Sequence, residues 1–194
     1  LITQLFGDRM YIANATGCSS IWGGSAPSTP YTVNKDGKGP AWANSLFEDN
    51  AEYGYGMFLA QSTIRNRTIA KVLELSKTTK AAALKKACEE YLETVDDGEK
   101  NSPATDNLIA ALKKTKNKAT EEILKDADYL RKKSMWIFGG DGWAYDIGFS
   151  GVDHVIAQGQ DVNIFVFDTE VYSNTGGQSS KSTPTGAIAQ FAAA

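Results

Sequence analysis

The sequence has little of what several protein classes depend on. It carries two cysteines and one histidine, His154, in 194 residues. Cys18 and Cys88 lie too far apart for a paired metal motif, and two cysteines do not make the disulfide framework of a small secreted domain. One histidine supplies no Ser-His-Asp or Cys-His arrangement, and no Gly-rich P-loop motif occurs. Hydrolase and NTPase functions therefore lack their residues, and we expect His154 to be structural.

Positive charge and long apolar runs are also scarce. Lys and Arg number 20 against 23 Asp and Glu, which gives a formal net charge of -3 at pH 7. The chain therefore lacks the basic surface that nucleic-acid binding requires. It has no run of 18 apolar residues, and its first ten residues lack the pattern of a signal peptide. We expect a cytoplasmic protein with neither a nucleic-acid nor a membrane partner.

The two ends of the sequence indicate part of a longer protein. The first residue is Leu1 rather than Met, and residues 186–194 (GAIAQFAAA) form an apolar, alanine-rich run. This run predicts the opening of a helix. We therefore expect the chain to be a fragment.

The first quarter of the chain alternates between regular structure and breakers. Residues 10–15 (MYIANA) predict a strand, and the small residues after them predict a loop. Gly and Pro make residues 21–44 a long predicted loop, anchored by Trp22 and Trp42. A capping box at Ser45 and Glu48 predicts that a helix begins there, with Glu48 and its acidic neighbours in a capping role.

The middle of the chain predicts helices with many Lys and Glu. Breaks are expected near Thr78, at residues 95–103 and near Asn117. Apolar residues recur at three- and four-residue steps at positions 84, 88, 91 and 95, which predicts a buried face and makes Cys88 a core residue. We interpret residues 57–134 as a helical insertion within a single domain spanning 1–194. The Lys-rich runs are typical of solvated faces, and docking of an acidic partner is the alternative.

The final third predicts a strand, a turn, a helix and a second strand. Residues 135–138 (MWIF) and 163–167 (NIFVF) are short apolar runs, with a turn at 139–142 and a helix at 147–158 between them. Two apolar strands joined by a crossover helix indicate the α/β class, with a mostly parallel sheet flanked by helices. Ligands of such sheets bind beyond the carboxyl ends of the strands, where this chain has polar loops.

These two loops carry the candidate chemistry. Asp141 lies between Gly140 and Gly142, and 26 residues separate Gly142 from Thr169, which opens the loop after the next strand. A carboxylate, a hydroxyl and a backbone carbonyl, with two diphosphate oxygens and a water, would complete the six-oxygen shell of Mg²⁺. Gly-Asp-Gly alone is also typical of an ordinary strand-to-helix turn. The spacing to Thr169 is that of the thiamine-diphosphate motif, in which Asn commonly takes the place of Thr169.

Three segments resemble one family nearly residue for residue. Residues 140–187 are similar to the cofactor segment of the pyruvate:ferredoxin (flavodoxin) oxidoreductases, and residues 12–31 and 39–57 are similar to other parts of it. The helical middle of the chain resembles the family in its general character and not residue for residue. Thr at position 169 is what this subfamily shows. The resemblance implies the thiamine-diphosphate-binding fold, in its diphosphate-binding half.

The resemblance also implies the residues of the site. Asp141, the Thr169 hydroxyl and the Val171 carbonyl would bind Mg²⁺, and Asn174 would be the catalytic residue that faces the substrate. The residues expected to bind the cofactors are Cys18, Gly140, Asp141, Gly142, Trp143, Thr169, Glu170, Val171, Tyr172, Ser173 and Asn174. Without the resemblance, residues 172–177 would be interpreted as a flexible Gly/Ser loop.

Cys18 has two interpretations. In Thr-Gly-Cys-Ser-Ser, a cysteine is typical of a small loop filler. The resemblance implies instead that Cys18 is one of four ligands of a [4Fe–4S] cluster, and the other three lie outside this sequence. We therefore expect no cluster in this chain alone.

The resemblance implies a complete reaction for the parent protein. It would oxidatively decarboxylate pyruvate to acetyl-CoA and CO2, with coenzyme A as co-substrate and electrons passing through iron–sulfur clusters to ferredoxin or flavodoxin. The parent would be a homodimer whose other domains supply the pyrimidine half of the thiamine site. A cluster-free thiamine-dependent decarboxylase, a non-catalytic diphosphate- or nucleotide-binding module, and a scaffold fragment inactive by itself are the alternatives.

Overall fold

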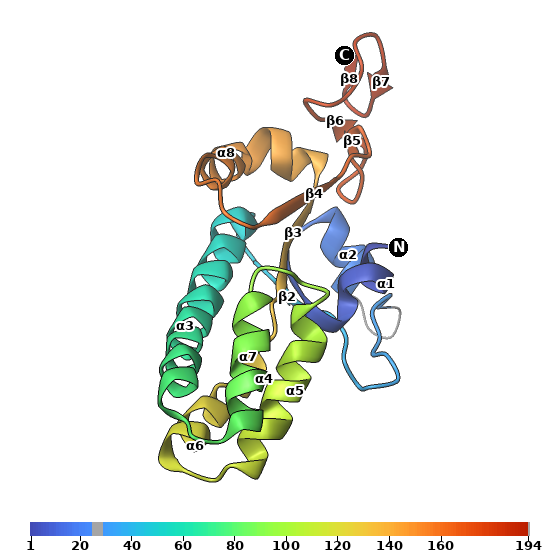
Figure 1. Ribbon diagram of the computed structural model, residues 1–194. Coiled ribbons are helices and arrows are strands. Elements are labelled where there is room, and N and C mark those ends of the chain that lie inside the picture. The colour runs from blue at the N-terminus through green and yellow to red at the C-terminus, as the bar shows by residue number, and fades with distance from the viewer. Residues whose placement is uncertain (25–28, 194) are drawn as a thin grey trace. The chain divides into compact units, whose positions relative to one another are not determined.

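The computed structural model describes residues 1–24 and 29–193 (Figure 1). Contacts divide the chain into two compact units. The sheet unit comprises Leu1–Phe58 and Ser134–Ala194, and the helical unit comprises Leu59–Lys133. Helix α3 (Asn50–Thr78) begins in the first unit and ends in the second. No helix in the described ranges is long and apolar enough to cross a membrane.

The remaining elements follow the chain in the order labelled in Figure 1. Before α3 come α1 (Ile2–Phe6), the 3-10 turn η1 (Gly7–Arg9), β1 (Met10–Asn14), α2 (Cys18–Gly24) and β2 (Ala41–Asn44). The helical unit continues with α4 (Ala82–Glu93), α5 (Asn101–Lys114), α6 (Lys118–Lys125) and α7 (Ala127–Leu130). The chain then forms β3 (Ser134–Gly140), the π-helix η2 (Gly142–Ile147), α8 (Phe149–Ala157), β4 (Asn163–Phe167), β5 (Val171–Tyr172), β6 (Gln178–Ser179), β7 (Ile188–Ala189) and β8 (Ala192–Ala193).

Four parallel strands form the sheet, in the order β2-β1-β3-β4. Ile12 of β1 pairs with Trp42 of β2 on one side and with Trp136 of β3 on the other. The chain therefore leaves β1 toward one edge and returns through β3 toward the opposite edge. The predicted α/β class and mostly parallel sheet are confirmed, and β3 and β4 are neighbours in it. Such a reversal of strand order leaves a crevice at the carboxyl ends of the two central strands.

Side chains alternate between the two faces of this sheet, as the two-residue period of a strand requires. In β3, Met135 and Ile137 join the core under α8 and the start of α3, whereas Trp136 and Phe138 join the core on the opposite face. α1 contributes Ile2 and Phe6 to that second core. Both faces of the sheet are therefore covered, as the uninterrupted apolar strands predict.

The helical unit has a separate core. Its centre consists of ten buried side chains: Val72, Leu75, Leu84, Ala87, Cys88, Tyr91, Leu108, Leu112, Ile123 and Leu130. The predicted buried face of α4 is confirmed, and burial raises the pKa of the Cys88 thiol to about 11. The thiol is therefore protonated at neutral pH and is an unreactive core group.

The helix breaks predicted near Thr78 and Asn117 are confirmed, and the break predicted at residues 95–103 is shorter at its end, because α5 begins at Asn101. α3 ends at Thr78, and α6 begins after Asn117, whose Oδ1 accepts from the backbone N–H of Thr120 at 2.9 Å. Thr120 Oγ1 in turn accepts from the backbone N–H of Asn117 at 3.0 Å. This reciprocal pair satisfies two donors that a helix end leaves without intrahelical partners.

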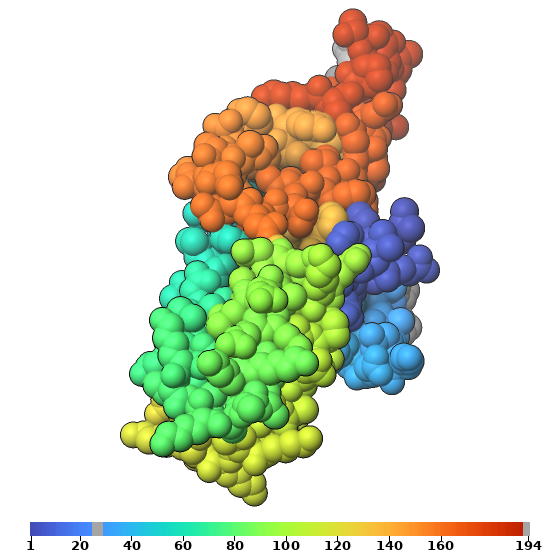
Figure 2. Space-filling model, in the orientation of Figure 1, coloured from blue at the N-terminus to red at the C-terminus, as the bar shows by residue number. Residues whose placement is uncertain are grey.

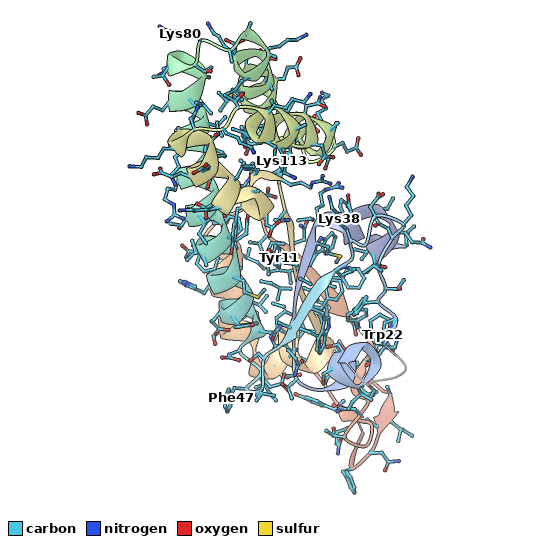
Figure 3. The ribbon with its side chains drawn as sticks, turned by 90° about the horizontal axis from the view of Figure 1, so that it is seen from below. Tyr11, Trp22, Lys38, Phe47, Lys80 and Lys113 are labelled. Atoms are coloured by element: carbon cyan, nitrogen blue, oxygen red, sulfur yellow. The ribbon has the colours of Figure 1, made fainter. Side chains whose placement is uncertain are left out.

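The capping box predicted at Ser45 and Glu48 is wrong. The helix begins at Asn50, and Ser45 Oγ donates to the carboxylate of Asp49 instead of capping a first turn. Glu48 has a left-handed backbone, with φ of 60°, which no residue inside a right-handed helix adopts. Residues 45–49 are therefore a tight turn between β2 and α3, with Phe47 extending from its edge (Figure 3).

The long loop predicted over residues 21–44 is interrupted twice. Helix α2 extends to Gly24, and residues 41–44 form the edge strand β2, paired in parallel with β1. The sequence Ala-Trp-Ala-Asn is too short to show a strand pattern of its own, and its extended conformation depends on pairing with β1. Residues 25–28 of this predicted loop lie outside the described residues.

Two boundaries in the last third differ from expectation. β3 continues through Gly140 and passes directly into η2, so the four residues 139–142 are not a separate turn, and α8 begins at Phe149. Residues 188–193 form the short antiparallel pair β7 and β8 rather than a helix. The backbone N–H of Gln190 donates to Gly177 O at 2.9 Å, so this segment pairs with a distant part of the loop instead of forming intrahelical hydrogen bonds. Figure 2 shows these C-terminal residues, in red, extending away from α8 and β4, and Phe191 is 93% exposed.

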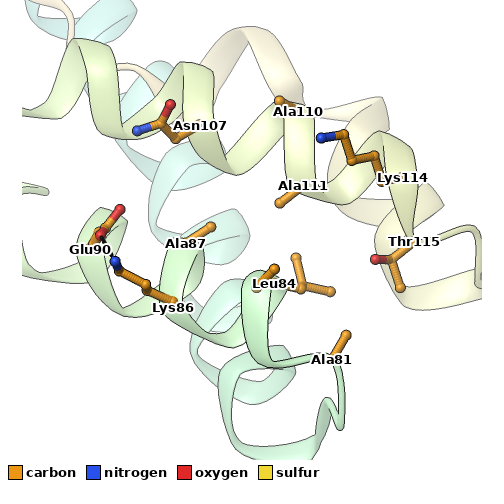
Figure 4. A pocket seen from close by; sticks show the side chains of 11 residues that line it. Ala81, Leu84, Lys86, Ala87, Glu90, Asn107, Ala110, Ala111, Lys114 and Thr115 are labelled. Carbon is orange, nitrogen blue, oxygen red and sulfur yellow. Dashed lines mark ion pairs between the residues drawn. The ribbon is translucent and has the colours of Figure 1, made fainter.

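A groove of about 480 Å³ lies between α4 and α5 (Figure 4). Alanine side chains form much of its wall, at positions 81, 83, 87, 110 and 111. Lys86 at its edge forms an ion pair with Glu90, with Nζ and Oε1 3.7 Å apart. Lys85, Lys86, Lys113 and Lys114 are all exposed, as the interpretation of the Lys-rich runs as solvated faces expects.

The buried hydroxyl of Tyr91 gives a stability test of the helical unit. It donates to Leu130 O at 2.9 Å, so Tyr91→Phe removes a buried hydrogen bond and lowers the free energy of unfolding by about 1 kcal/mol. The measurement is urea-induced unfolding followed by circular dichroism. Tyr53→Phe is the matched control, because Tyr53 is 41% exposed and its hydroxyl can bind water. Equal stability of the Tyr91→Phe variant and the parent would contradict this assignment.

Candidate functional site

A pocket of about 260 Å³ lies in the sheet unit at the carboxyl ends of its strands. Residues 16–19 follow β1, Glu48 follows β2, residues 140–143 end β3 and open η2, and residues 171–175 lie beyond β4. All four strands therefore contribute a lining segment. The central two contribute at the crevice where the strand order reverses, which is where α/β sheets bind ligands.

Three oxygen atoms meet at one end of this pocket. The Thr169 hydroxyl donates to Asp141 Oδ1 at 3.1 Å and lies 3.0 Å from Val171 O, and the Thr169 backbone N–H donates to Asp141 Oδ1 at 3.2 Å. β3 and β4 are neighbours, with Gly140 paired to Phe167, which brings the two loops together. Asp141, Thr169 and Val171, the predicted Mg²⁺ ligands, are therefore adjacent. We call these three oxygens the oxygen cluster.

The second carboxylate oxygen of Asp141 is held from the other side. Ser180 Oγ donates to Oδ2 at 2.5 Å and Ser182 Oγ at 3.1 Å. Asp141 is 1% exposed, and burial by itself raises its pKa, but hydrogen bonds from Ser180 and the Thr169 backbone outweigh burial and hold the pKa below its ordinary value. Asp141 is therefore an oriented anion at neutral pH. Neither serine was predicted, although the hydroxyl-rich run Ser-Ser-Lys-Ser at 179–182 was a signal for them.

The donor set of the oxygen cluster suits a hard cation. A carboxylate, a hydroxyl and a carbonyl are ligands that Mg²⁺ prefers to nitrogen or sulfur. Within the described ranges, no group of three or more His, Cys, Asp or Glu residues lies together. A cation on the oxygen cluster would have the Asp141 carboxylate as its charged ligand and would take further oxygens from an anionic ligand such as a diphosphate. These residues fit the Mg-diphosphate group that the sequence motif implies.

Glycines let aromatic rings pack against this end of the site. A Cβ added at Gly142 would lie 2.3 Å from Cε1 of Tyr172, so the ring lies directly on the glycine backbone. Trp143 is similarly enclosed, because a Cβ at Gly139 or at Gly148 would lie 2.3 Å from its indole ring. Burial and the nearby Asp146 raise the pKa of Tyr172 to about 12, so its hydroxyl is neutral. Gly142 thereby fixes the position of the loop that carries Val171.

A second part of the pocket lining contains Cys18 and Asn174. Cys18 Sγ donates to Asn174 Oδ1 at 3.1 Å, and Ser173 Oγ donates to Cys18 Sγ at 3.0 Å. These contacts join the start of α2 to the loop beyond β4, across about 155 positions of sequence. Cys18 is a half-buried free thiol. It therefore lies in the same pocket as the oxygen cluster.

The predicted site residues divide into three groups. Those that line the pocket are Cys18, Gly140, Asp141, Gly142, Trp143, Val171, Tyr172 and Asn174. Thr169 and Ser173 reach it through hydrogen bonds to Asp141 and Cys18. Glu170 is exposed, and its backbone carbonyl accepts from Thr183 Oγ1 at 2.5 Å, so the structure gives it a role in loop conformation rather than in the lining. Glu48 also lines the pocket. The sequence did not predict this position, because the spacing of Ser45 and Glu48 matches that of a capping box.

No family model matches the chain. Curated relatives match it closely. The pyruvate-flavodoxin oxidoreductase of Klebsiella pneumoniae is 58% identical over 195 residues, and the pyruvate:ferredoxin oxidoreductase of Moorella thermoacetica is 56% identical over 200 residues. Each alignment covers 100% of this chain and 17% of the relative. The chain corresponds to one segment of the pyruvate oxidoreductases.

The resemblance predicted from the sequence is thereby confirmed. A more distant relative, the mitochondrial pyruvate dehydrogenase [NADP(+)] of Euglena gracilis, is 50% identical over 195 residues, with 99% of this chain and 11% of the relative covered. The chain spans about a sixth of the length of the first two oxidoreductases. The oxygen cluster and Cys18 thus lie in a chain that is similar to one segment of much longer relatives.

The contact between Gly142 and Tyr172 predicts a sharp difference between two glycines. Gly142→Ala places a methyl group into the Tyr172 ring and lowers the free energy of unfolding by about 1–3 kcal/mol, the usual cost of overpacking. Gly140→Ala is the matched control, because its nearest neighbour would be Phe167 O at 3.8 Å. The measurement is thermal unfolding of both variants. Equal losses of stability would show that the ring does not lie on Gly142.

Proposed function

We propose that this chain supplies the Mg-diphosphate half of a thiamine-diphosphate site in an oxidoreductase that converts pyruvate to acetyl-CoA and CO2. The observation that carries the proposal is the oxygen cluster of Asp141, Thr169 and Val171 at the carboxyl edge of the sheet. The names of the relatives, all of them pyruvate oxidoreductases or dehydrogenases, support the substrate.

Each residue of the pocket has a part in this proposal. Asp141 Oδ1, Thr169 Oγ1 and Val171 O would hold Mg²⁺, while Ser180 and Ser182 keep the Asp141 carboxylate oriented. The other residues expected at the diphosphate and thiazolium site are Gly140, Gly142, Trp143, Tyr172 and Ser173. Asn174 would face the substrate, and Glu170 would hold the conformation of the loop between Thr169 and Val171. Thiamine diphosphate would supply the electron sink for decarboxylation, which no amino-acid side chain provides.

Cys18 would connect this site to electron transfer. Its thiol lies beside Asn174 and would provide one of four ligands of a [4Fe–4S] cluster, the other three coming from the remainder of the parent chain. Electrons would pass from there to ferredoxin or flavodoxin, and the acetyl group to coenzyme A. The parent would be a cytoplasmic homodimer, with the helical unit as an insertion in one cofactor-binding domain.

Asp141→Asn tests the proposal in the complete oxidoreductase. The substitution keeps the shape of the side chain and removes the negative charge that a cation needs. We expect Mg²⁺-dependent binding of thiamine diphosphate, measured by isothermal titration calorimetry, to weaken by roughly 100-fold or more. Coenzyme A-dependent reduction of a viologen dye by pyruvate, assayed anaerobically, should be lost with it.

A matched charge removal elsewhere gives the control for this experiment. Asp153→Asn lies on the exposed face of α8 and should leave both readouts unchanged. If the parent bound ADP as tightly as thiamine diphosphate and reduced no dye with any 2-oxoacid, the chain would belong to a diphosphate-binding module instead.

A further inference from the structure

Glu48 adopts a backbone conformation that a glutamate rarely takes. Its φ is 60°, in the left-handed region that favours glycine, and among the other non-glycine residues described Glu170 and Phe191 share this region. Two hydrogen bonds of the Ser45 hydroxyl stabilise the turn that contains Glu48. The hydroxyl donates to the Asp49 carboxylate and accepts from the backbone N–H of Phe47 at 3.4 Å. Backbone strain of this kind is concentrated at functional sites, where the side chain is needed in one position.

The strained backbone directs the Glu48 side chain into the pocket. Glu48 is one of the lining residues, and its Oε1 would lie 3.6 Å from a Cβ at Gly17. No hydrogen bond or ion pair joins the carboxyl group to any other residue in the described ranges. Phe47, beside it, is 82% exposed and extends from the edge of the turn (Figure 3). The carboxyl group is thus half-buried and has a cavity in front of it.

Glu48 belongs to the Cys18 end of the pocket. Its Oε1 lies near Gly17, whose neighbour Cys18 bonds to Asn174. The oxygen cluster at the other end would hold the diphosphate in the proposed function, which leaves the Cys18 end for the reacting groups. Tyr172 lines the same pocket as Asp141 and Glu48.

We propose that Glu48 is a substrate-binding residue, whose carboxyl group donates a hydrogen bond to an oxygen of the 2-oxoacid. This inference rests on the proposed function. It adds a residue on β2's side of the pocket to Asn174 on the opposite side, so that the substrate would bind between two side chains.

The donor role follows from charge. A 2-oxoacid is an anion, and an ionised carboxylate in the same pocket would repel it. A neutral carboxyl group can instead offer its proton, and an O–H···O⁻ bond is among the stronger hydrogen bonds in proteins. Burial raises the pKa of Glu48 and so favours the neutral form.

The experiment compares Glu48→Gln with Glu48→Ala in the complete oxidoreductase. The Gln amide keeps a hydrogen-bond donor and the length of the side chain, whereas Ala keeps neither. We expect Glu48→Ala to raise KM for pyruvate by about 10- to 100-fold and Glu48→Gln to stay within about 10-fold of the parent. Both variants should bind Mg-thiamine diphosphate with the affinity of the parent in calorimetry, because Glu48 acts on the substrate.

Three outcomes would overturn the inference. They are an unchanged KM in Glu48→Ala, equal losses in both variants, which would require an ionised carboxylate, and weakened cofactor binding, which would make Glu48 a cofactor ligand. Glu52→Ala is the control, since Glu52 lies four positions away on an exposed surface and does not line the pocket. Failure of the proposed function is distinguishable, because the parent itself would then bind no thiamine diphosphate and reduce no dye with pyruvate.

Discussion

The contact between Asp141 and Thr169 organises the pocket. It joins the end of β3 to the loop beyond β4 through two hydrogen bonds to a single carboxylate oxygen. The other oxygen of the same carboxylate bonds to Ser180 and Ser182, which lie 39 and 41 positions further along the chain. A buried anion requires such partners, because an unpaired charge in this position would destabilise the fold by several kcal/mol. The backbone N–H and hydroxyl of Thr169 and the hydroxyls of Ser180 and Ser182 are therefore all positioned by the Asp141 carboxylate.

Close backbone packing extends this arrangement to the rest of the site. Tyr172 lies on Gly142, which positions Val171, and Trp143 lies between Gly139 and Gly148. Cys18 then joins the far side of the pocket to the same loop through Ser173 and Asn174. The pocket thus contains the oxygen cluster and the Cys18 thiol, with the loop of residues 169–174 in contact with both. That arrangement suits an elongated ligand with an anionic group at one end and a reactive group at the other.

Sequence patterns predicted the parts of this structure that rest on local or periodic signals. The apolar runs at 135–138 and 163–167 predicted two strands of a parallel sheet. The structure makes these strands neighbours, and this adjacency is what brings Thr169 to Asp141. The helical steps at Leu84, Cys88 and Tyr91 predicted a buried face for the same reason. The apolar runs and the helical steps both lie within the segment whose structure they predict.

Features that depend on distant partners could not be predicted in the same way. β2 has four residues and gains its order from pairing with β1, so its sequence shows no strand pattern. Ser45 and Glu48 match a capping box by spacing, but the left-handed conformation of Glu48 moves the helix start to Asn50. The partners of Asp141 at Ser180 and Ser182 become visible only when the loop folds back.

The account is tested most directly by locating the cation. Crystals of the complete oxidoreductase with thiamine diphosphate and Mn²⁺ in place of Mg²⁺ would show the metal by its anomalous scattering. We predict one peak about 2.0–2.2 Å from Asp141 Oδ1, Thr169 Oγ1 and Val171 O, with diphosphate oxygens completing the shell. A metal bound elsewhere, or a diphosphate bound without contact between the metal and Asp141, would contradict the central claim.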